Sequence, residues 1–261
     1  MNSSNRPVAL VTGASSGIGA ALARELARRG HDLVLSARRL EPMEALAEEL
    51  RQLGAAATIV IADLARPDGA ASLLRDLESR GLEVEVLINN AGLGRFARFD
   101  RTDATRIDEM MQVNMVALTQ LTHALLAAMQ ARGRGKIMLV ASTASFIPCP
   151  NLAVYAATKA YVRSFGEALA EELRGSAITV NVLCPGTTAT NFFDVAGGTV
   201  NGMQAGRMMS PEAVAKIGVD GLLRGERVTV AGLANRVLAF AAMHTPHFLT
   251  LPATAKMLAQ E

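Results

Sequence analysis

The sequence has no tryptophan and is poor in cysteine, tyrosine and histidine. Among its 261 residues there are two cysteines, two tyrosines and four histidines, and aromatic residues make up 4% of the chain. Two cysteines are too few for a disulfide framework, and Cys149 and Cys184 lack the Cys and His spacing of a metal site. We therefore expect no disulfide and no bound metal, a cysteine usage that is typical of a reducing cytoplasm.

The sequence also lacks an excess of one charge and a long apolar run. Its 26 basic and 24 acidic residues give a net charge of +2, and the arginines are spread along the chain, which argues against a nucleic-acid partner. The richest apolar run, residues 237–243, is far shorter than the roughly 20 residues that a membrane span requires. The first apolar run, residues 8–11, leads straight into a glycine turn, so a core strand is expected rather than a signal peptide. These features favour a cytoplasmic protein without a membrane partner.

What the sequence does have is a regular alternation of strands and helices. Half of its residues are apolar, and the predicted strands are nearly continuous runs of valine, isoleucine, leucine and alanine. Such runs are typical of strands buried on both faces, as in a parallel sheet covered by helices. We therefore predict an α/β fold in a single domain over residues 1–261, with one doubly wound parallel sheet between two helical layers. The predicted strands are residues 7–12, 32–37, 57–62, 84–88, 136–141 and 178–183, and the helices between them are residues 20–29, 41–53, 67–80, 103–132 (one long helix or two abutting ones) and 152–174.

The pattern changes in the last fifth of the chain. Residues 212–223 predict a helix and residues 227–231 a short strand. The C-terminal extension that follows, about residues 233–261, is expected to form two apolar helices broken at Pro246 and Pro252. It could pack on its own domain, form a subunit interface or touch a membrane surface. The last use needs a basic amphipathic face, and the basic residues of this extension are too sparse for one.

A glycine turn joins the first predicted strand to the first predicted helix. Gly13 allows a sharp bend, Gly17 lets the backbone approach a pyrophosphate, and Gly19 permits close packing of helix on sheet. The helix N-terminus then offers N–H groups and a partial positive charge to the phosphates. A glycine turn that only packs tightly is the alternative, but the flanking strand and helix favour a dinucleotide site. The expected cofactor contacts in this turn are Gly13, Ser15, Ser16, Gly17, Ile18 and Gly19.

The second predicted strand ends in Ala37, and Arg38 and Arg39 follow it. A site for NAD usually places Asp or Glu there, to accept a hydrogen bond from the ribose 2′-hydroxyl. A guanidinium suits the 2′-phosphate of NADP instead, because it can donate several charge-assisted hydrogen bonds to one phosphate. We therefore expect NADP(H) to be preferred; the alternative is a pair of solvated arginines that open a surface helix.

Two further loops follow predicted strands and are expected to contact the cofactor. Asp63 and Leu64 come after the third strand, where the adenine edge would lie. Asn90, Ala91 and Gly92 come after the fourth, where small residues let the backbone run along the cofactor. Taken alone, either segment could be an ordinary loop.

Tyr155 and Lys159 stand four residues apart in a predicted helix, so their side chains share one face. With only two tyrosines and four lysines in the chain, a chance pairing at this spacing is improbable. A free phenol has a pKa of about 10, and a nearby ammonium together with the positive ring of an oxidised nicotinamide favours the phenolate and lowers that pKa. Tyr155 is therefore predicted to be the general acid in reduction and the base in oxidation, with Lys159 also donating to the nicotinamide ribose. The alternative is an aromatic helix position beside a lysine that reaches to solvent.

Ser142 and Asn114 are weaker candidates for the same site. Ser142 follows the fifth strand at the carboxyl edge, where such sheets bind ligands, and its hydroxyl can hold a carbonyl oxygen as charge develops. Asn114 lies inside a predicted helix, where asparagine is unfavourable, and is expected to hold a water that links Lys159 to solvent. Either residue, taken alone, would be assigned a structural role.

As a set, these motifs resemble the short-chain dehydrogenase/reductase superfamily, in its single-domain branch. The resemblance covers residues 7 to about 195. It implies a Rossmann fold, a nicotinamide cofactor, and a homodimer or homotetramer built on the helices around residues 114–132 and 152–174. It also implies that the segment 185–190 holds the nicotinamide carboxamide, with Thr190 as a side-chain contact. The implied catalytic tetrad is Asn114, Ser142, Tyr155 and Lys159, and the implied contacts in the later segment are Pro185, Gly186, Thr188 and Thr190.

The apolar C-terminal extension departs from the family pattern, because many members end soon after a last strand. It resembles a less characterised bacterial subgroup of general oxidoreductases, and is also similar to hydroxysteroid and long-chain 3-ketoacyl reductases. An extension of this kind could cover one of the usual tetramer interfaces.

Two apolar segments, residues 144–152 and 191–209, are expected to wall the substrate side. Their aromatic and aliphatic side chains favour an apolar carbonyl compound over a sugar or a charged acid; the alternative is that they form core and an ordinary hinge. The expected pocket residues are Phe146, Leu152, Phe192 and Phe193. The second segment predicts a mobile, adaptable lid over about residues 187–210, through Gly197, Gly198, Gly202, Met203, Met208 and Met209.

The leading hypothesis is an NADP(H)-dependent oxidoreductase that acts on an apolar ketone, aldehyde or secondary alcohol. A catalytically silent dinucleotide-binding sensor on the same fold is the alternative, although a sensor has no need of Ser142 and Tyr155 together. An epimerase or dehydratase is a third hypothesis, but those relatives usually carry a longer substrate domain.

Overall fold

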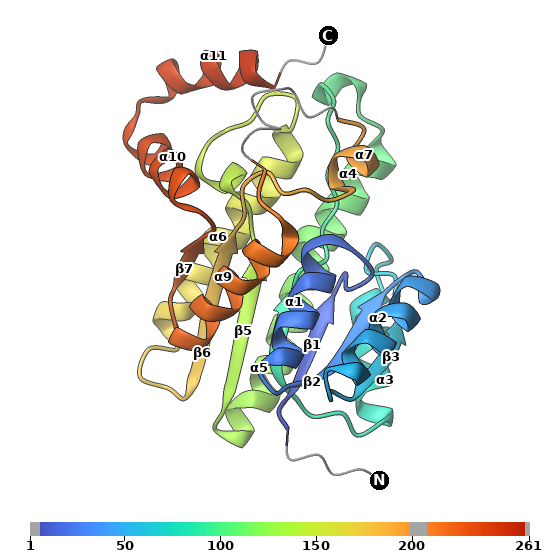
Figure 1. The fold of residues 1–261 in the computed structure, drawn as a ribbon. Coiled ribbons are helices and arrows are strands. Elements are labelled where there is room, and N and C mark those ends of the chain that lie inside the picture. The colour runs from blue at the N-terminus through green and yellow to red at the C-terminus, as the bar shows by residue number, and fades with distance from the viewer. Residues whose placement is uncertain (1–5, 199–207, 259–261) are drawn as a thin grey trace.

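The computed structural model describes residues 6–198 and 208–258. Seven strands form one parallel sheet in the order β3-β2-β1-β4-β5-β6-β7 (Figure 1). This order confirms the predicted doubly wound α/β fold, because the chain works outward from β1 in both directions. The strands are β1 (Val8–Thr12), β2 (Asp32–Ala37), β3 (Ala57–Ile61), β4 (Val84–Asn89), β5 (Gly135–Val140), β6 (Ile178–Cys184) and β7 (Val228–Val230).

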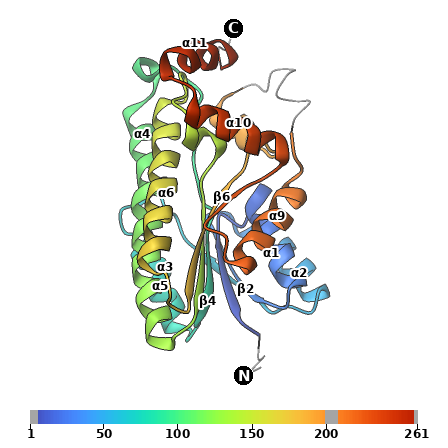
Figure 2. The ribbon, with the colours of Figure 1, turned by 90° about the vertical axis from the view of Figure 1, so that its left-hand side faces the viewer.

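Helices cover both faces of the sheet in two layers, as Figure 2 shows. One layer holds α3 (Gly69–Ser79), α5 (Leu118–Arg132) and α6 (Ala153–Glu172), and the other holds α1 (Gly17–Arg28), α2 (Leu40–Gln52) and α9 (Pro211–Arg224). Alternate residues of each strand enter different cores. In β1, Leu10 packs into the first layer while Ala9 and Val11 pack into the second. Burial on both faces explains why these strands read as continuous apolar runs.

The helix predicted over residues 103–132 is interrupted by a wider turn. It consists of α4 (Ala104–Met111), the π-helical turn η2 (Gln112–Ala117) and α5. Helix α1 starts three residues earlier than predicted, at Gly17. The short elements η1 (Phe99–Arg101), η3 (Thr143–Phe146) and α7 (Phe192–Ala196) were not predicted, since each is too brief to show a period.

The C-terminal extension forms α10 (Leu233–His244) and α11 (His247–Met257) at one end of the molecule (Figure 1). The predicted break at Pro246 is confirmed, since Pro246 is the residue before α11. The predicted break at Pro252 is wrong: α11 continues through it, because a proline can remove one intrahelical hydrogen bond without ending a helix. Within the described ranges, no helix combines the length and apolar character needed to cross a membrane.

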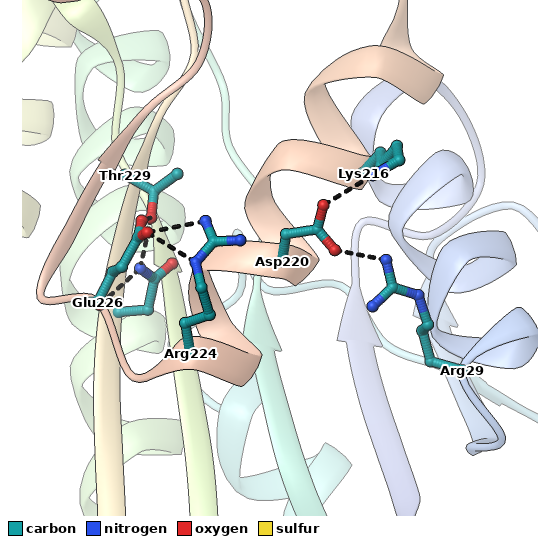
Figure 3. A network of polar contacts seen from close by, with 7 residues as sticks. Arg29, Lys216, Asp220, Arg224, Glu226 and Thr229 are labelled. Atoms are coloured by element: carbon teal, nitrogen blue, oxygen red, sulfur yellow. Dashed lines mark hydrogen bonds and ion pairs between the residues drawn. The ribbon is translucent and has the colours of Figure 1, made fainter.

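Polar contacts fix α9 against α1 on the second layer (Figure 3). The Asp220 carboxylate accepts from Lys216, one turn earlier in α9, over 2.8 Å, and pairs with Arg29 at the end of α1. The carboxyl pKa of Asp220 is lowered, chiefly by its hydrogen bonds to Lys216 and Arg29. These contacts lie far from the glycine turn, so we assign them to the scaffold.

Candidate active site

The glycine turn after β1 is tightly constrained. Gly13 and Gly17 have φ of +66° and +56°, a left-handed conformation that residues with a side chain rarely adopt. A Cβ at Gly19 would lie 2.3 Å from the carbonyl oxygen of Gly13, so the helix can start only where this position lacks a side chain. The three glycines therefore serve the backbone geometry that was expected of a dinucleotide turn.

The turn is joined to the end of β4 by side-chain hydrogen bonds. The hydroxyl of Thr12 accepts from the backbone N–H groups of Asn90 and Ala91, each over 3.0 Å. The Asn90 amide donates to the Thr12 carbonyl over 2.9 Å and to the Gly13 carbonyl over 3.3 Å. Asn90 and Ala91, both expected near the cofactor, thus support the turn and bring the β4 loop beside it.

The surroundings of the turn fit a dinucleotide with an extra phosphate. Ser16 precedes α1, and among the described residues its side chain makes no capping hydrogen bond, which leaves the first N–H groups of α1 for a phosphate. Arg38 and Arg39 are exposed at the end of β2, and neither forms an ion pair with a described residue. The Arg39 guanidinium reaches the Ser15 hydroxyl over 3.5 Å, so it lies beside the turn.

The remaining expected cofactor residues lie in several environments. Thr190 packs on the turn, since a Cβ at Gly17 would lie 3.0 Å from its methyl carbon. The Asp63 carboxylate accepts from the backbone N–H of Ala65, and the Leu64 side chain is buried in the first core, so only its backbone could meet a cofactor. The side chain of Ile18 packs against the second core. Further along, the Pro185 carbonyl accepts from Thr143 over 2.8 Å, and the Thr188 hydroxyl donates to the Gly186 carbonyl over 3.0 Å.

Ser142 and Tyr155 lie near one another at the carboxyl edge of the sheet, close enough for the serine hydroxyl to act on the tyrosine pKa. Ser142 follows β5 and lies at the N-terminus of η3, where its hydroxyl oxygen accepts from the backbone N–H of Ala144 over 3.1 Å. Tyr155 lies in the first turn of α6. Desolvation raises the pKa of Tyr155 to about 12, and the Ser142 hydroxyl partly opposes this shift. The groups of the protein by themselves therefore raise the tyrosine pKa, and the lowering expected with an oxidised nicotinamide stays a prediction.

Lys159 is buried one turn after Tyr155 in α6, with 4% of its surface exposed. Its ammonium donates to the carbonyl of Val140, at the end of β5, over 2.8 Å, and lies 5.8 Å from the centre of the Tyr155 ring. Burial lowers the pKa of Lys159 to about 8. The ammonium therefore stays mostly charged at neutral pH and keeps two further N–H groups for a ligand.

Asn114 is fully buried within the π-helical turn η2. Its amide donates to the Leu93 carbonyl over 2.9 Å and to the Thr158 hydroxyl over 2.9 Å, and its carbonyl accepts from Leu93 N–H over 2.8 Å. A Cβ at Gly92 would lie 3.2 Å from the Lys159 nitrogen and 3.4 Å from the Asn114 amide oxygen, so all three residues are neighbours. The Asn114 amide group is occupied by protein groups and fixes the Leu93 loop beside Lys159, and the water expected at Asn114 stays a prediction.

An apolar cluster covers the side of Tyr155 away from the glycine turn. The Phe192 and Tyr155 ring centres lie 5.4 Å apart, and Phe193 packs against both Phe192 and Phe96. The cluster comprises buried Phe96, Cys149, Leu152, Ala156, Ala196 and Leu258, with Ala144, Ile147, Tyr155, Phe192 and Phe193 packed against it. Phe96 and Leu258 were not predicted. The sequence carries no signal for them, because their role depends on how distant segments meet.

Phe146 lies apart from this cluster. Its ring packs under the Arg163 guanidinium at 4.5 Å and borders a hollow of about 500 Å³ between α6, β7 and α10. The turn η3 explains the difference, because it points the end of the 143–146 segment toward α6. Met209 likewise packs against the second core, while Gly202 and Met203 of the expected lid lie outside the described residues.

Comparison with known proteins identifies the family. The model of the family described as short chain dehydrogenase matches residues 7–201. The chain belongs to the short-chain dehydrogenase family. Membership supports an oxidoreductase with a nicotinamide cofactor and a small-molecule substrate.

Three relatives illustrate how the short-chain dehydrogenase match extends. A 17-beta-hydroxysteroid dehydrogenase type 3 from Mus musculus is 35% identical over 70% of this chain, but the match spans only 60% of that protein. A short-chain dehydrogenase from Sphingobium yanoikuyae, solved in complex with NADPH, is 35% identical with a TM-score of 0.82 and 95% coverage of both chains. A bulky-bulky ketone specific alcohol dehydrogenase from Comamonas testosteroni is 31% identical with a TM-score of 0.77, covering 97% of this chain and 93% of the other. The two structural matches include the C-terminal part of the chain, which lies beyond the family model.

Proposed function

We propose that this chain is an NADP(H)-dependent oxidoreductase that interconverts an apolar ketone or aldehyde with the corresponding alcohol, with Tyr155 as the general acid and base. The observation that carries the proposal is the grouping of Ser142 and Tyr155 with buried Lys159, next to a glycine turn that fits a dinucleotide. A sensor would need the turn alone.

The chain's own groups account for the proton transfer. A phenol with a pKa of about 12 is protonated at neutral pH, so Tyr155 is ready to donate a proton to the oxygen of a carbonyl substrate. The hydroxyl of Ser142 can hold the same oxygen as negative charge develops on it. When bound, the dinucleotide supplies the hydride that the substrate carbon gains in reduction. In oxidation Tyr155 must first lose its proton, and the phenolate then takes up the alcohol proton.

Lys159 supports this step by its charge and its position. With one N–H on the Val140 carbonyl, its ammonium has two left, and these would hold the ribose hydroxyls next to the nicotinamide. Its positive charge favours the phenolate that Tyr155 becomes once the proton has left. Asn114 would act through the Leu93 loop, which it ties beside Lys159.

Two arginines at the end of β2 support the preference for NADP(H). Arg38 and Arg39 are exposed next to the turn and pair with no carboxylate in the described part of the chain. A 2′-phosphate would give these guanidinium groups an anionic partner, whereas a 2′-hydroxyl would leave them without one. The NADPH bound in the Sphingobium relative agrees with this preference.

The apolar cluster around Tyr155 supports the preference for an apolar substrate. Its side chains are aromatic and aliphatic, and a charged substrate would lose its hydration there without gaining a partner. The names of the steroid dehydrogenase and of the bulky ketone enzyme among the relatives support the same substrate class.

A homodimer or homotetramer is proposed through the outer faces of α4, η2 and α6. Met111, Val116 and Tyr161 expose large apolar surface there, between 37% and 41% of each residue. Light scattering on the purified protein tests this assembly, and a monomer at micromolar concentration would exclude it.

The first test is consumption of NADPH with a panel of aromatic, steroid, acyl and short aliphatic carbonyl compounds. We expect turnover of at least one apolar ketone, and Tyr155→Phe should lower the rate by about 10³-fold while NADPH still binds, since general acid catalysis contributes on this order. Binding without any turnover would favour the sensor, and absence of NADPH binding would remove the proposal at its first step.

A further inference from the structure

The end of helix α11 returns to the substrate side of the molecule. Most of α11 is exposed: Phe248 and Leu249 show 74% and 56% of their surface to solvent. The buried positions are Thr254 and Leu258, one helical turn apart, with 5% and 8% exposed. The helix therefore turns a narrow face inward, and that face ends at Leu258 in the cluster around Tyr155.

Asn151 holds the end of this helix in place. Its side-chain amide donates to the backbone carbonyl of Leu258 over 3.0 Å, across 107 positions of sequence. The backbone carbonyl of Asn151 accepts from the backbone N–H of Ala97 over 2.9 Å. Asn151 thus joins three segments that border the cluster: the loop after β4, the loop before α6 and the C-terminal extension.

The backbone of Asn151 is itself unusual. Its φ of 64° places it in the left-handed region, and among the described residues it is the one non-glycine residue with a positive φ. Asparagine tolerates this conformation better than most residues. This strained residue directly precedes Leu152, which is buried in the cluster one turn before Tyr155. The conformation of the loop therefore places both side chains at the cluster.

We infer that Leu258 is a specificity-determining residue: it forms the outer wall of the substrate pocket and limits the size of the apolar group beside the carbonyl. Asn151 is the positioning residue that keeps this wall closed. The inference rests on the proposed function for the identity of the ligand. It assigns the substrate wall to a segment outside the matched family region, residues 7–201.

The burial pattern supports a wall rather than a packed core helix. The outer face of α11 exposes large apolar side chains to solvent. The C-terminal half of the helix is buried at Thr254 and Leu258, and Asn151 donates a hydrogen bond to Leu258. A leucine at this point occupies volume in the same apolar cluster as Phe96 and Cys149. Truncation to alanine would leave that volume for substrate atoms.

The first experiment measures kcat/KM on the full chain with NADPH and a series of aryl ketones whose second substituent grows from methyl to phenyl. Leu258→Ala should raise the ratio of the bulkiest to the smallest ketone by about tenfold, and Leu258→Phe should lower it, since single groups in apolar pockets discriminate on this scale. Leu249→Ala, the same change on the exposed face of α11, is the matched control and should leave the ratio unchanged. Equal ratios for Leu258→Ala and Leu249→Ala would overturn the inference.

Asn151→Gly tests the positioning residue, because glycine accepts the same backbone conformation but removes the amide donor. We expect KM to rise for every ketone while kcat changes little. A fall in kcat without a change in KM would contradict a role in holding the wall.

A second readout needs no turnover and separates this inference from the proposed function. Cys149 is buried in the cluster, and Cys184, fully buried elsewhere, is an internal reference. Labelling by N-ethylmaleimide, followed by peptide mass spectrometry, should become at least about fivefold faster at Cys149 in Leu258→Ala and Asn151→Gly, and should not change at Cys184. If no ketone is reduced but Cys149 opens selectively, the wall stands and the proposed reaction fails. If Cys149 labelling is the same in Leu249→Ala and Leu258→Ala, the wall is absent.

Discussion

The proposed cofactor side and the proposed substrate side of this molecule are shaped by different parts of the chain, the first mainly by backbone geometry and the second by apolar side chains. On the proposed cofactor side, the turn is defined by backbone geometry: two left-handed glycines, a third with no room for a Cβ, and the N-terminus of α1. The substrate side consists of apolar side chains that come from the loop after β4, the loop before α6, α7 and the end of α11. Backbone geometry accepts almost no substitution, whereas an apolar wall accepts many residues of similar volume. One side can therefore stay fixed while the other is varied to suit a substrate.

Gly19→Ala should give the largest effect, because it acts on the side made of backbone. The new Cβ would lie 2.3 Å from the Gly13 carbonyl oxygen and 2.5 Å from the Asn90 amide. We expect NADPH affinity to fall by about 100-fold or more, with a loss of about 1–3 kcal/mol in the free energy of unfolding. Isothermal titration with NADPH and urea denaturation measure the two.

Gly81→Ala is the control for that variant, since Gly81 has a φ of +62° but open space where its Cβ would lie. It should cost about 1 kcal/mol of stability and leave NADPH affinity unchanged. Equal NADPH affinity in the two variants would show that the turn is not the cofactor site.

Arg38→Ala should give the next largest effect, confined to one cofactor. Loss of a charge-assisted hydrogen bond of about 1.5–3 kcal/mol would weaken NADPH binding by roughly 10–100-fold and leave NADH binding nearly unchanged. Titration with both cofactors measures the ratio. An undiminished preference for NADPH would rule out Arg38 as its source.

The dependence of kcat/KM on pH tests Lys159, which lies between the proposed cofactor side and Tyr155. Since burial lowers its pKa to about 8, the ammonium loses its proton above that pH, and kcat/KM for reduction should fall toward tenfold per pH unit. Tyr155 remains protonated there, because its pKa lies near 12. Between pH 8 and 10.5, Lys159 binds more protons in the unfolded chain than in the folded one. Its contribution to the free energy of unfolding therefore increases with pH over this window. A decline in rate while the unfolding transition stays intact would support the assignment, and a flat rate up to pH 10 would contradict it.

Phe192→Ala should give the smallest effect, on the side made of side chains. Its ring packs against Tyr155 at 5.4 Å, and an aromatic contact of this kind contributes about 1 kcal/mol. We expect KM for an apolar ketone to rise roughly fivefold with unchanged NADPH affinity. A change in NADPH affinity instead would place Phe192 on the cofactor side and weaken the comparison.

The same contrast explains what could be predicted from the sequence. The doubly wound parallel sheet follows from continuous apolar runs between helices, and the turn from three glycines within seven residues of the chain. Tyr155 and Lys159 could be found because one helical turn joins them. All of these are local patterns, and the physical reason for each lies within a few residues.

The remaining features depend on contacts between distant segments. Leu258 reaches Asn151 across 107 positions, and nothing in either local sequence indicates that meeting. Phe146 was expected beside Phe192 but packs on Arg163, because the turn η3 redirects it. The Tyr155 pKa shift was expected from two positive charges, Lys159 and an oxidised nicotinamide, whereas burial, which depends on the whole fold, raises this pKa in the protein itself.

The strand order β3-β2-β1-β4-β5-β6-β7 also bears on how the protein is made. As the chain leaves the ribosome, β1 comes first, and every later strand has its place beside one that has already emerged. β2 and β3 extend one edge, and β4 to β7 then extend the other in turn. N-terminal parts generally fold first during synthesis, so the sheet can grow one edge strand at a time without waiting for a distant partner. The contact between Leu258 and Asn151 spans 107 positions, so it can form only after α11 has also emerged.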